Sequence, residues 1–120
     1  MKKLLPVLFI LIITSCSKEV PSDQLVVRDG IYYEVNSQTP FSGTSVKYYE
    51  NGQLGMRENY KDGKEEGIFE YYYENGQLNR KSTYKNGKED GLEESYSQNG
   101  ELQYSTCFQK SEIVDDSHCD

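Results

Sequence analysis

Residues 48–54 read Tyr-Tyr-Glu-Asn-Gly-Gln-Leu, and the same seven residues return at 72–78. The Asn-Gly pair and the leucine occur again within residues 99–102, so the three copies are spaced 24 residues apart. Aromatic residues and leucines keep this interval along the chain. The repeated framework positions are Tyr48, Tyr72 and Tyr96, then Leu54, Leu78 and Leu102, and finally Tyr60, Tyr84 and Phe108. A fixed period of this length is the sequence signature of a repeat protein.

Each repeat contains two turn signals. Asn-Gly and Asp-Gly pairs tolerate the positive φ angles of tight hairpins and are strong short-range hairpin signals. The turn glycines are Gly52, Gly63, Gly76, Gly87 and Gly100. Segments rich in Tyr, Phe, Ile and Thr separate these turns, and each is long enough for one strand. We therefore expect an all-β fold, a single-layer antiparallel meander of about seven strands in which each pairs with its sequence neighbour.

The composition supports this expectation. The chain has 120 residues, of which 35% are hydrophobic, and it contains 11 tyrosines, 10 glycines and no alanine. Alanine is the best helix former, whereas tyrosine favours strands, so the bias is away from helix. A chain of this length forms one small domain.

The loop length decides which side chains share a face of the sheet. A two-residue loop at Asn51-Gly52 would pair Tyr49 with Leu54, whereas a three-residue loop with a left-handed Gly52 pairs Tyr48 with Leu54. We favour the second loop because it places all the framework columns on one face. That face would also carry Met56, Ile68, Leu92 and Tyr104. The other face would carry Tyr49, Phe69, Tyr71 and Tyr73 among Lys47, Arg57, Lys81, Glu65 and Glu93.

The first residues resemble a bacterial lipoprotein signal. Lys2 and Lys3 precede an apolar run over residues 4–13, which is too short to span a bilayer but fits a secretory signal. The following Ile-Thr-Ser-Cys, which ends at Cys16, resembles a lipobox. The resemblance implies cleavage before Cys16, lipidation of its thiol and acylation of its amine, for example with palmitate. The alternative is a plain signal peptide in which Cys16 is incidental.

The chain thus divides into four predicted segments: a signal peptide (1–15), a lipidated tether (16–27), a repeat domain (28–108) and an acidic tail (109–120). Residues 31–35 are expected to form a degenerate leading strand. Cys107 and Cys119 form an even pair in an oxidising compartment, and this predicts a disulfide that folds the tail back over the last strand. A metal site with His118 lacks a fourth ligand, so no metal is expected.

The repeats resemble the MORN-repeat variant family of bacterial proteins. The matching segments are residues 48–54, 60–67, 72–78 and 84–91, with a partial match at 96–102, and the resemblance extends over roughly 28–108. Some members of that family are described as antitoxins of the YwqK family of toxin–antitoxin systems. The resemblance implies an extended antiparallel sheet used for binding, and it supplies no catalytic residue and no cofactor.

Charge and residue content narrow the function. A net charge of −7 argues against nucleic acid, and a single histidine leaves no Ser–His–Asp arrangement, so we expect no enzyme. We predict a protein-binding module in the cell envelope, lipid-anchored and, in a Gram-negative cell, on the outer membrane facing the periplasm. Its membrane contact would be through the lipid alone. The predicted binding patch is Tyr49, Phe69, Tyr71 and Tyr73.

Several alternatives stay open. The aromatic side chains could serve only to cover the sheet's own backbone. The protein could instead be an antitoxin or immunity protein that neutralises a toxin, or a lipoprotein that binds peptidoglycan or another carbohydrate. Open edge strands would also allow an edge-to-edge homodimer.

Overall fold

The structure, a computed structural model, describes residues 18–120. The predicted signal peptide and the lipidation site Cys16 lie outside the described residues. The elements in chain order are β1 (Glu19–Pro21), η1 (Ser22–Gln24), β2 (Leu25–Arg28), β3 (Ile31–Glu34), β4 (Gly43–Tyr48), β5 (Leu54–Lys61), β6 (Lys64–Glu65), β7 (Gly67–Tyr72), β8 (Leu78–Lys85), β9 (Lys88–Glu89), β10 (Gly91–Tyr96), β11 (Leu102–Gln109), β12 (Glu112–Val114) and η2 (Asp116–His118).

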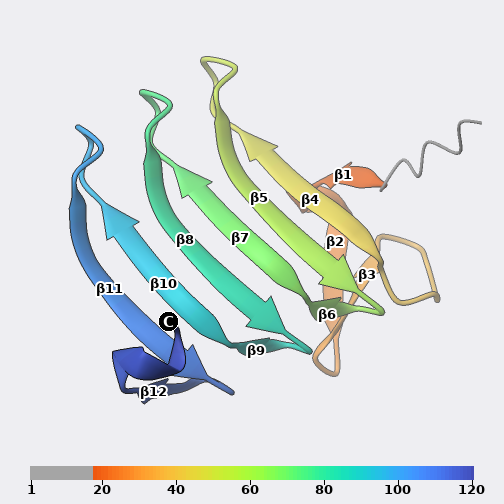
Figure 1. The fold of residues 1–120 in the computed structure, drawn as a ribbon. Helices are drawn as coiled ribbons and strands as arrows, with labels where there is room; N and C mark the ends of the chain where they lie inside the picture. The colour runs from red at the N-terminus through yellow and green to blue at the C-terminus, as the bar shows by residue number, and fades with distance from the viewer. Residues whose placement is uncertain (1–17) are drawn as a thin grey trace, which may run out of the picture.

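One curved sheet contains most of these strands (Figure 1). Its order is β1-β4-β5-β7-β8-β10-β11-β12, with the short strands β6 and β9 attached to β5 and β8. All its pairs are antiparallel except that of β1 with β4. The predicted all-β antiparallel meander is therefore confirmed. The expected strand over residues 31–35 is present as β3, but its place at the start of the meander is wrong, because β3 pairs with β2 in a separate two-stranded sheet.

The hairpin turns follow the predicted loop types. Tyr48 pairs with Leu54, and the amide N–H of Tyr49 donates to the carbonyl of Gln53 at 2.8 Å. Gly52 has a φ of +85°, the left-handed position of the three-residue loop. At the other end of the hairpins, Asp62-Gly63 forms a two-residue turn with both φ angles positive.

The predicted assignment of side chains to faces is wrong, because a β-bulge follows each Asn-Gly turn. Tyr48 pairs with Leu54, but the next pair is Lys47 with Met56, so Gly55 is an extra residue. The same shift leaves Asn79 and Gln103 unpaired in the later repeats. Side chains alternate along a strand, so one extra residue moves every later side chain to the other face. The columns of Tyr48 and Leu54 therefore lie on one face and the column of Tyr60, Tyr84 and Phe108 on the other.

Phe69 and Tyr71 consequently share the face of Tyr60, which we call the core face, while Ile68 and Leu92 lie on the opposite face. The core is a cluster of Val20, Phe41, Tyr60 and Phe69. The ring centroids of Tyr60 and Phe69 are 5.7 Å apart, and those of Phe69 and Tyr84 are 4.4 Å apart. Tilted rings at such distances attract beyond their buried area.

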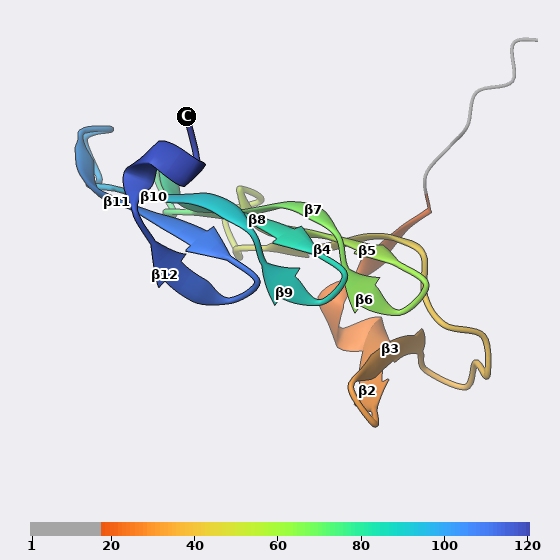
Figure 2. The same ribbon diagram turned by 60° about the horizontal axis from the view of Figure 1, so that its bottom comes forward.

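The β2–β3 hairpin covers one end of the core face. Leu25 and Tyr32 pack against the cluster, and the rings of Tyr32 and Tyr60 are 4.8 Å apart. Figure 2 shows this hairpin on one side of the sheet and η2 on the other. The hairpin supplies a second layer where the single sheet has none.

The predicted tether is wrong from Glu19 onward, because this segment is part of the fold. Val20 is 6% exposed in the core, and its burial holds β1 against β4. Thr44 donates its amide N–H to the carbonyl of Lys18 at 2.8 Å. At Gly43 a Cβ would collide with that carbonyl oxygen, so the close approach of the two chains requires glycine.

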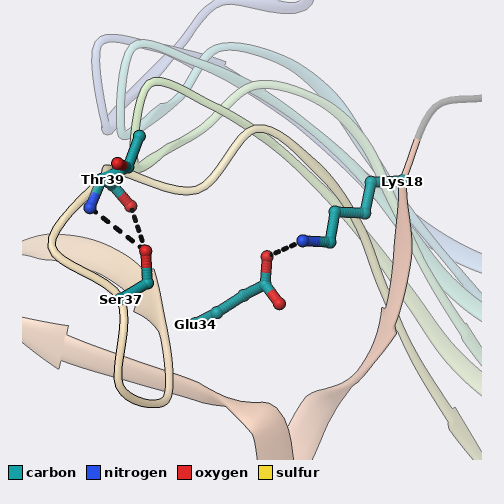
Figure 3. Close-up of polar contacts among 4 residues, drawn as sticks. All are labelled: Lys18, Glu34, Ser37 and Thr39. Carbon is teal, nitrogen blue, oxygen red and sulfur yellow. Dashed lines mark hydrogen bonds and ion pairs between the residues drawn. The ribbon is translucent and has the colours of Figure 1, made fainter.

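Polar contacts fasten the same end of the molecule. Lys18 forms an ion pair with Glu34 of β3, and the Ser37 hydroxyl accepts the Thr39 amide N–H at 3.2 Å in the loop that follows (Figure 3). The ion pair thus links the residue before β1 to β3.

The acidic C-terminal segment lies beside the last strand of the repeats. β12 pairs with residues 107–109 of β11, and η2 follows it. Cys107 is 1% exposed, its Cα lies 5.9 Å from that of Cys119, and the two sulfurs are at bonding distance. This geometry suits the predicted disulfide, whose formation in the cell stays a prediction.

Replacing Phe69 with alanine tests the assignment of the core face. We expect Phe69→Ala to lower the free energy of unfolding by about 3–5 kcal/mol, as for other buried phenylalanines. Its neighbour Ile68, which is 40% exposed on the opposite face, is the matched control. Ile68→Ala should cost no more than about 1 kcal/mol, because it removes little buried apolar area. Urea unfolding followed by circular dichroism measures both, and equal losses would contradict the observed register.

Candidate functional site

The core face beyond the β2–β3 hairpin presents aromatic and charged side chains side by side. The strand register places Tyr71 of β7 between Met56 of β5 and Arg80 of β8. The guanidinium carbon of Arg80 lies 4.8 Å from the centroid of the Tyr71 ring. This is a cation–π contact, and it fixes both side chains on the surface.

Glu58 orients the tyrosines of this surface. The hydroxyls of Tyr60 and Tyr71 donate to its two carboxylate oxygens at 2.7 and 2.6 Å. Burial, followed by the hydrogen bond to Glu58, raises the pKa of Tyr71 well above its ordinary value. The environment of Tyr71 thus favours its protonated form, which donates the hydrogen bond to Glu58.

A shallow hollow of about 220 Å³ opens beside Tyr71. We call it the Tyr71 hollow. Its lining consists of Lys47, Tyr48, Tyr49, Gly55, Met56 and Tyr71. The bulge residue Gly55 makes room for it, since a Cβ there would lie 3.1 Å from the Tyr49 ring. The hollow thus combines three tyrosines, a methionine, a glycine and a lysine.

The four predicted patch residues do not form one exposed patch. Tyr49 and Tyr71 lie together in the Tyr71 hollow. Phe69 is only 4% exposed, and its assignment to the exposed patch is wrong because the bulge turns it into the core. Tyr73 lies one repeat further along, in a separate hollow of about 410 Å³ that Tyr49 also borders. Whether these tyrosines bind a partner stays a prediction.

Two of these tyrosines also link neighbouring repeats. The Tyr49 hydroxyl donates to the backbone carbonyl of Tyr72 at 2.6 Å, and the Tyr73 hydroxyl donates to that of Tyr96 at 2.7 Å. Asn51 makes the equivalent side-chain contact with the carbonyl of Glu74 at 3.0 Å. The hydroxyls of Tyr49 and Tyr73 therefore serve the sheet's own backbone, as one of the alternatives above anticipates, while the ring of Tyr49 still borders the hollow.

A second polar cluster lies further along the core face. The buried hydroxyl of Ser82 donates to Glu93 at 3.3 Å, and Glu89 lies beside it with one buried carboxylate oxygen. Burial and the nearby Glu93 raise the pKa of Glu89 to about 7. The pair resembles other like-charged carboxyls, which share a site by holding one proton.

Sequence reasoning missed Glu58, Arg80, Ser82 and Glu89, because they become neighbours only through the strand register. One signal was available: a glycine inside a strand segment, Gly55, indicates a bulge. Among residues 18–120, no group of three or more His, Cys, Asp or Glu side chains is placed to hold a metal ion. No helix in that range is long and apolar enough to cross a bilayer.

Three stacked hairpins with equivalent contacts define this chain as a β-hairpin repeat protein. The model of the MORN repeat variant family matches residues 42–62, 65–86 and 89–110. These segments make up more than half of the chain, and the chain belongs to the MORN repeat variant family. The expected resemblance is confirmed over them, whereas residues 28–41 lie outside the match. No curated protein and no solved structure matched the chain.

The raised pKa of Glu89 predicts a pH dependence of stability. The folded-state value of about 7 lies above the ordinary value of 4.5, so protonation favours the folded state. The stabilising effect is complete below the ordinary value and is lost as the pH rises through 7. The glutamine side chain of the Glu89→Gln variant is uncharged at every pH, so this variant should not lose stability as the pH rises through 7.

Urea unfolding below, within and above that pH range measures the difference between the protein and Glu89→Gln. We expect the variant to gain in relative stability as the pH rises. The exposed Glu101→Gln is the matched control for the loss of one negative charge. A constant difference between Glu89→Gln and the parent protein across the range would contradict the prediction.

Proposed function

We propose that this protein is a non-enzymatic binding module, lipid-anchored in the bacterial cell envelope, that contacts a partner protein through the Tyr71 hollow. MORN repeats are commonly protein- or membrane-binding modules and do not carry a catalytic site. The observation that carries the proposal is the hollow itself, in which Met56 of β5, Tyr71 of β7 and Tyr49 just after β4 lie together.

The chemistry of the hollow suits a protein surface. Tyrosine offers a large amphipathic contact area at a low cost in side-chain entropy, and methionine adapts to irregular shapes. Tyr71 is held in place by both Glu58 and Arg80, so a partner would meet an ordered ring. Lys47 lines the hollow, and its positive charge favours an acidic side chain on the partner.

The envelope anchor rests on the lipobox that ends at Cys16. Several acyl chains hold a protein on a membrane without any spanning helix. An antitoxin or immunity role would be a narrower form of the same binding function, exercised in the envelope. The identity of the captured partner would show whether that partner is a toxin.

Lipidation is tested by expressing the protein in bacteria with radiolabelled palmitate. We expect the label in the parent protein and none in Cys16→Ser, because acylation depends on the modified cysteine. The variant should also leave the detergent-extracted membrane fraction. Cys119→Ser is the matched control for the loss of a thiol, and equal labelling of Cys16→Ser and the parent would contradict the anchor.

The binding role is tested by photo-crosslinking in intact cells. A photo-reactive amino acid in place of Met56 should give a protein adduct, whereas one in place of Val27, which is 56% exposed on the β2–β3 hairpin, should not. Lys47→Glu should reduce the Met56 adduct by about tenfold, since reversing a contact charge costs on the order of 1.4 kcal/mol.

Lys61→Glu makes the same charge change at the far end of β5 and should leave the adduct intact. Equal adducts from both probe positions, or equal effects of the two lysine variants, would contradict the assignment of the hollow. An adduct that a muramidase digests and a protease does not would instead identify a cell-wall glycan as the ligand.

A further inference from the structure

The outer edge of β11 is open along most of its length. β12 pairs only with residues 107–109. Within the described residues, no strand pairs with residues 102–106 on that side, and Figure 1 shows this part of β11 as the free border of the sheet. Unpaired backbone groups along such an edge can pair with an extended segment of another chain.

The inner repeats show what pairs at this position. β5 pairs with β7 through Arg57 and Glu70, and β8 pairs with β10 through Lys81 and Glu94. One repeat later the equivalent residue of β11 is Ser105, where no partner strand follows in the described part of the chain. The free edge of β11 is thus equivalent to the edges of β5 and β8 that pair with β7 and β10.

The charges on the face opposite the core indicate the chemistry of the missing strand. Arg57, Glu70, Lys81 and Glu94 follow one another across neighbouring strands, so the charge alternates. Glu70 has a basic neighbour on each side, whereas Glu94 has Lys81 on one side and the neutral Ser105 on the other. Opposite charges on paired strands stabilise a sheet.

A basic residue on an added strand would restore this alternation. Strands lie about 4.8 Å apart, so an arginine or lysine opposite Ser105 can extend over that small side chain towards Glu94. Carboxylates lie beyond both ends of the free edge. They are Glu101 on one side, and Glu112, Asp115, Asp116 and Asp120 on the other. On the core face, the Tyr104 ring is 53% exposed and open to a cation, as the Tyr71 ring is to Arg80.

We propose that the free edge of β11 binds, by strand addition, an extended segment of another protein with an arginine or lysine opposite Ser105. This contact lies apart from the Tyr71 hollow, and its failure would leave the binding role of that hollow untouched.

A second copy of this chain fits the edge less well. At the other border of the sheet, β1 already covers Thr44–Val46 and ends in Pro21, which has no N–H to donate, so head-to-tail stacking is blocked. Two β11 edges paired with each other would present uncharged residues over 102–106 and leave Glu94 without a basic neighbour. The net charge of −7 on each copy opposes association as well.

The test uses the protein expressed with all 120 residues of the sequence and purified in detergent. Fluorescence anisotropy follows the binding of a labelled eight-residue peptide in which arginine alternates with valine. We expect this peptide to bind, and the matched peptide with glutamate in place of arginine not to bind. A version of the arginine peptide that is N-methylated at alternate residues should also fail, because it cannot complete the backbone hydrogen bonds of an added strand.

Variants of the protein locate the contact. Ser105→Lys should weaken the arginine peptide by about tenfold, because it places a like charge at the pairing position. Glu94→Gln should weaken it by about threefold, the loss expected for one exposed ion pair. Gln24→Lys makes the same charge change as Ser105→Lys but at the opposite end of the molecule, so it should leave the affinity within about twofold. Circular dichroism confirms that each variant is folded.

Four results would overturn the proposal. They are an absence of binding, equal binding of the N-methylated peptide, equal effects of Ser105→Lys and Gln24→Lys, and a dimer in sedimentation equilibrium that Ser105→Lys dissociates. The last result would assign the edge to a second copy of the chain.

Discussion

Lateral contact between neighbouring strands is the constraint on which this structure depends. Apart from the end that the β2–β3 hairpin covers, the sheet has no opposing layer, so most strands of the repeats are stabilised mainly by the strands beside them. The ring of Phe41, in the loop before β4, and the rings of Tyr60, Phe69 and Tyr84, on β5, β7 and β8, contact one another in series along the core face. Beyond Tyr84 the same face turns polar with Ser82 and Glu93, and β12 pairs with the end of β11.

The repeats and turns could be predicted because they depend on local chemistry. The Asn-Gly and Asp-Gly pairs favour tight turns whatever lies across the strand, and the loop at Gly52 has the predicted form. The faces could not be predicted from the period, because the bulged position is Gly55 in one repeat but Asn79 in the next. Counting alternate residues along a strand assigns side chains to the wrong face once one unpaired residue has been passed.

Only part of the candidate site could be predicted, because strand register decides which side chains become neighbours. Tyr49 and Tyr71 were named from their type and do line the hollow, whereas Glu58 and Arg80 join them only through the register. The segment around Val20 was expected to be a tether, since polar residues surround it, yet the burial of Val20 and the pairing of β1 with β4 make it part of the fold. The polar composition of a segment does not reveal whether one of its apolar side chains is buried in the core.

The bulge beside each Asn-Gly turn limits how such a chain can change in length. Loss or gain of one residue within β5 or β8 would exchange the inside and outside of everything up to the next turn, and would expose Tyr60 or Tyr84 to water. Removal or duplication of a whole hairpin keeps every neighbour relation intact. Such a protein can therefore change in length by whole hairpins during evolution, whereas the insertion or deletion of a single codon within these strands would disrupt its fold.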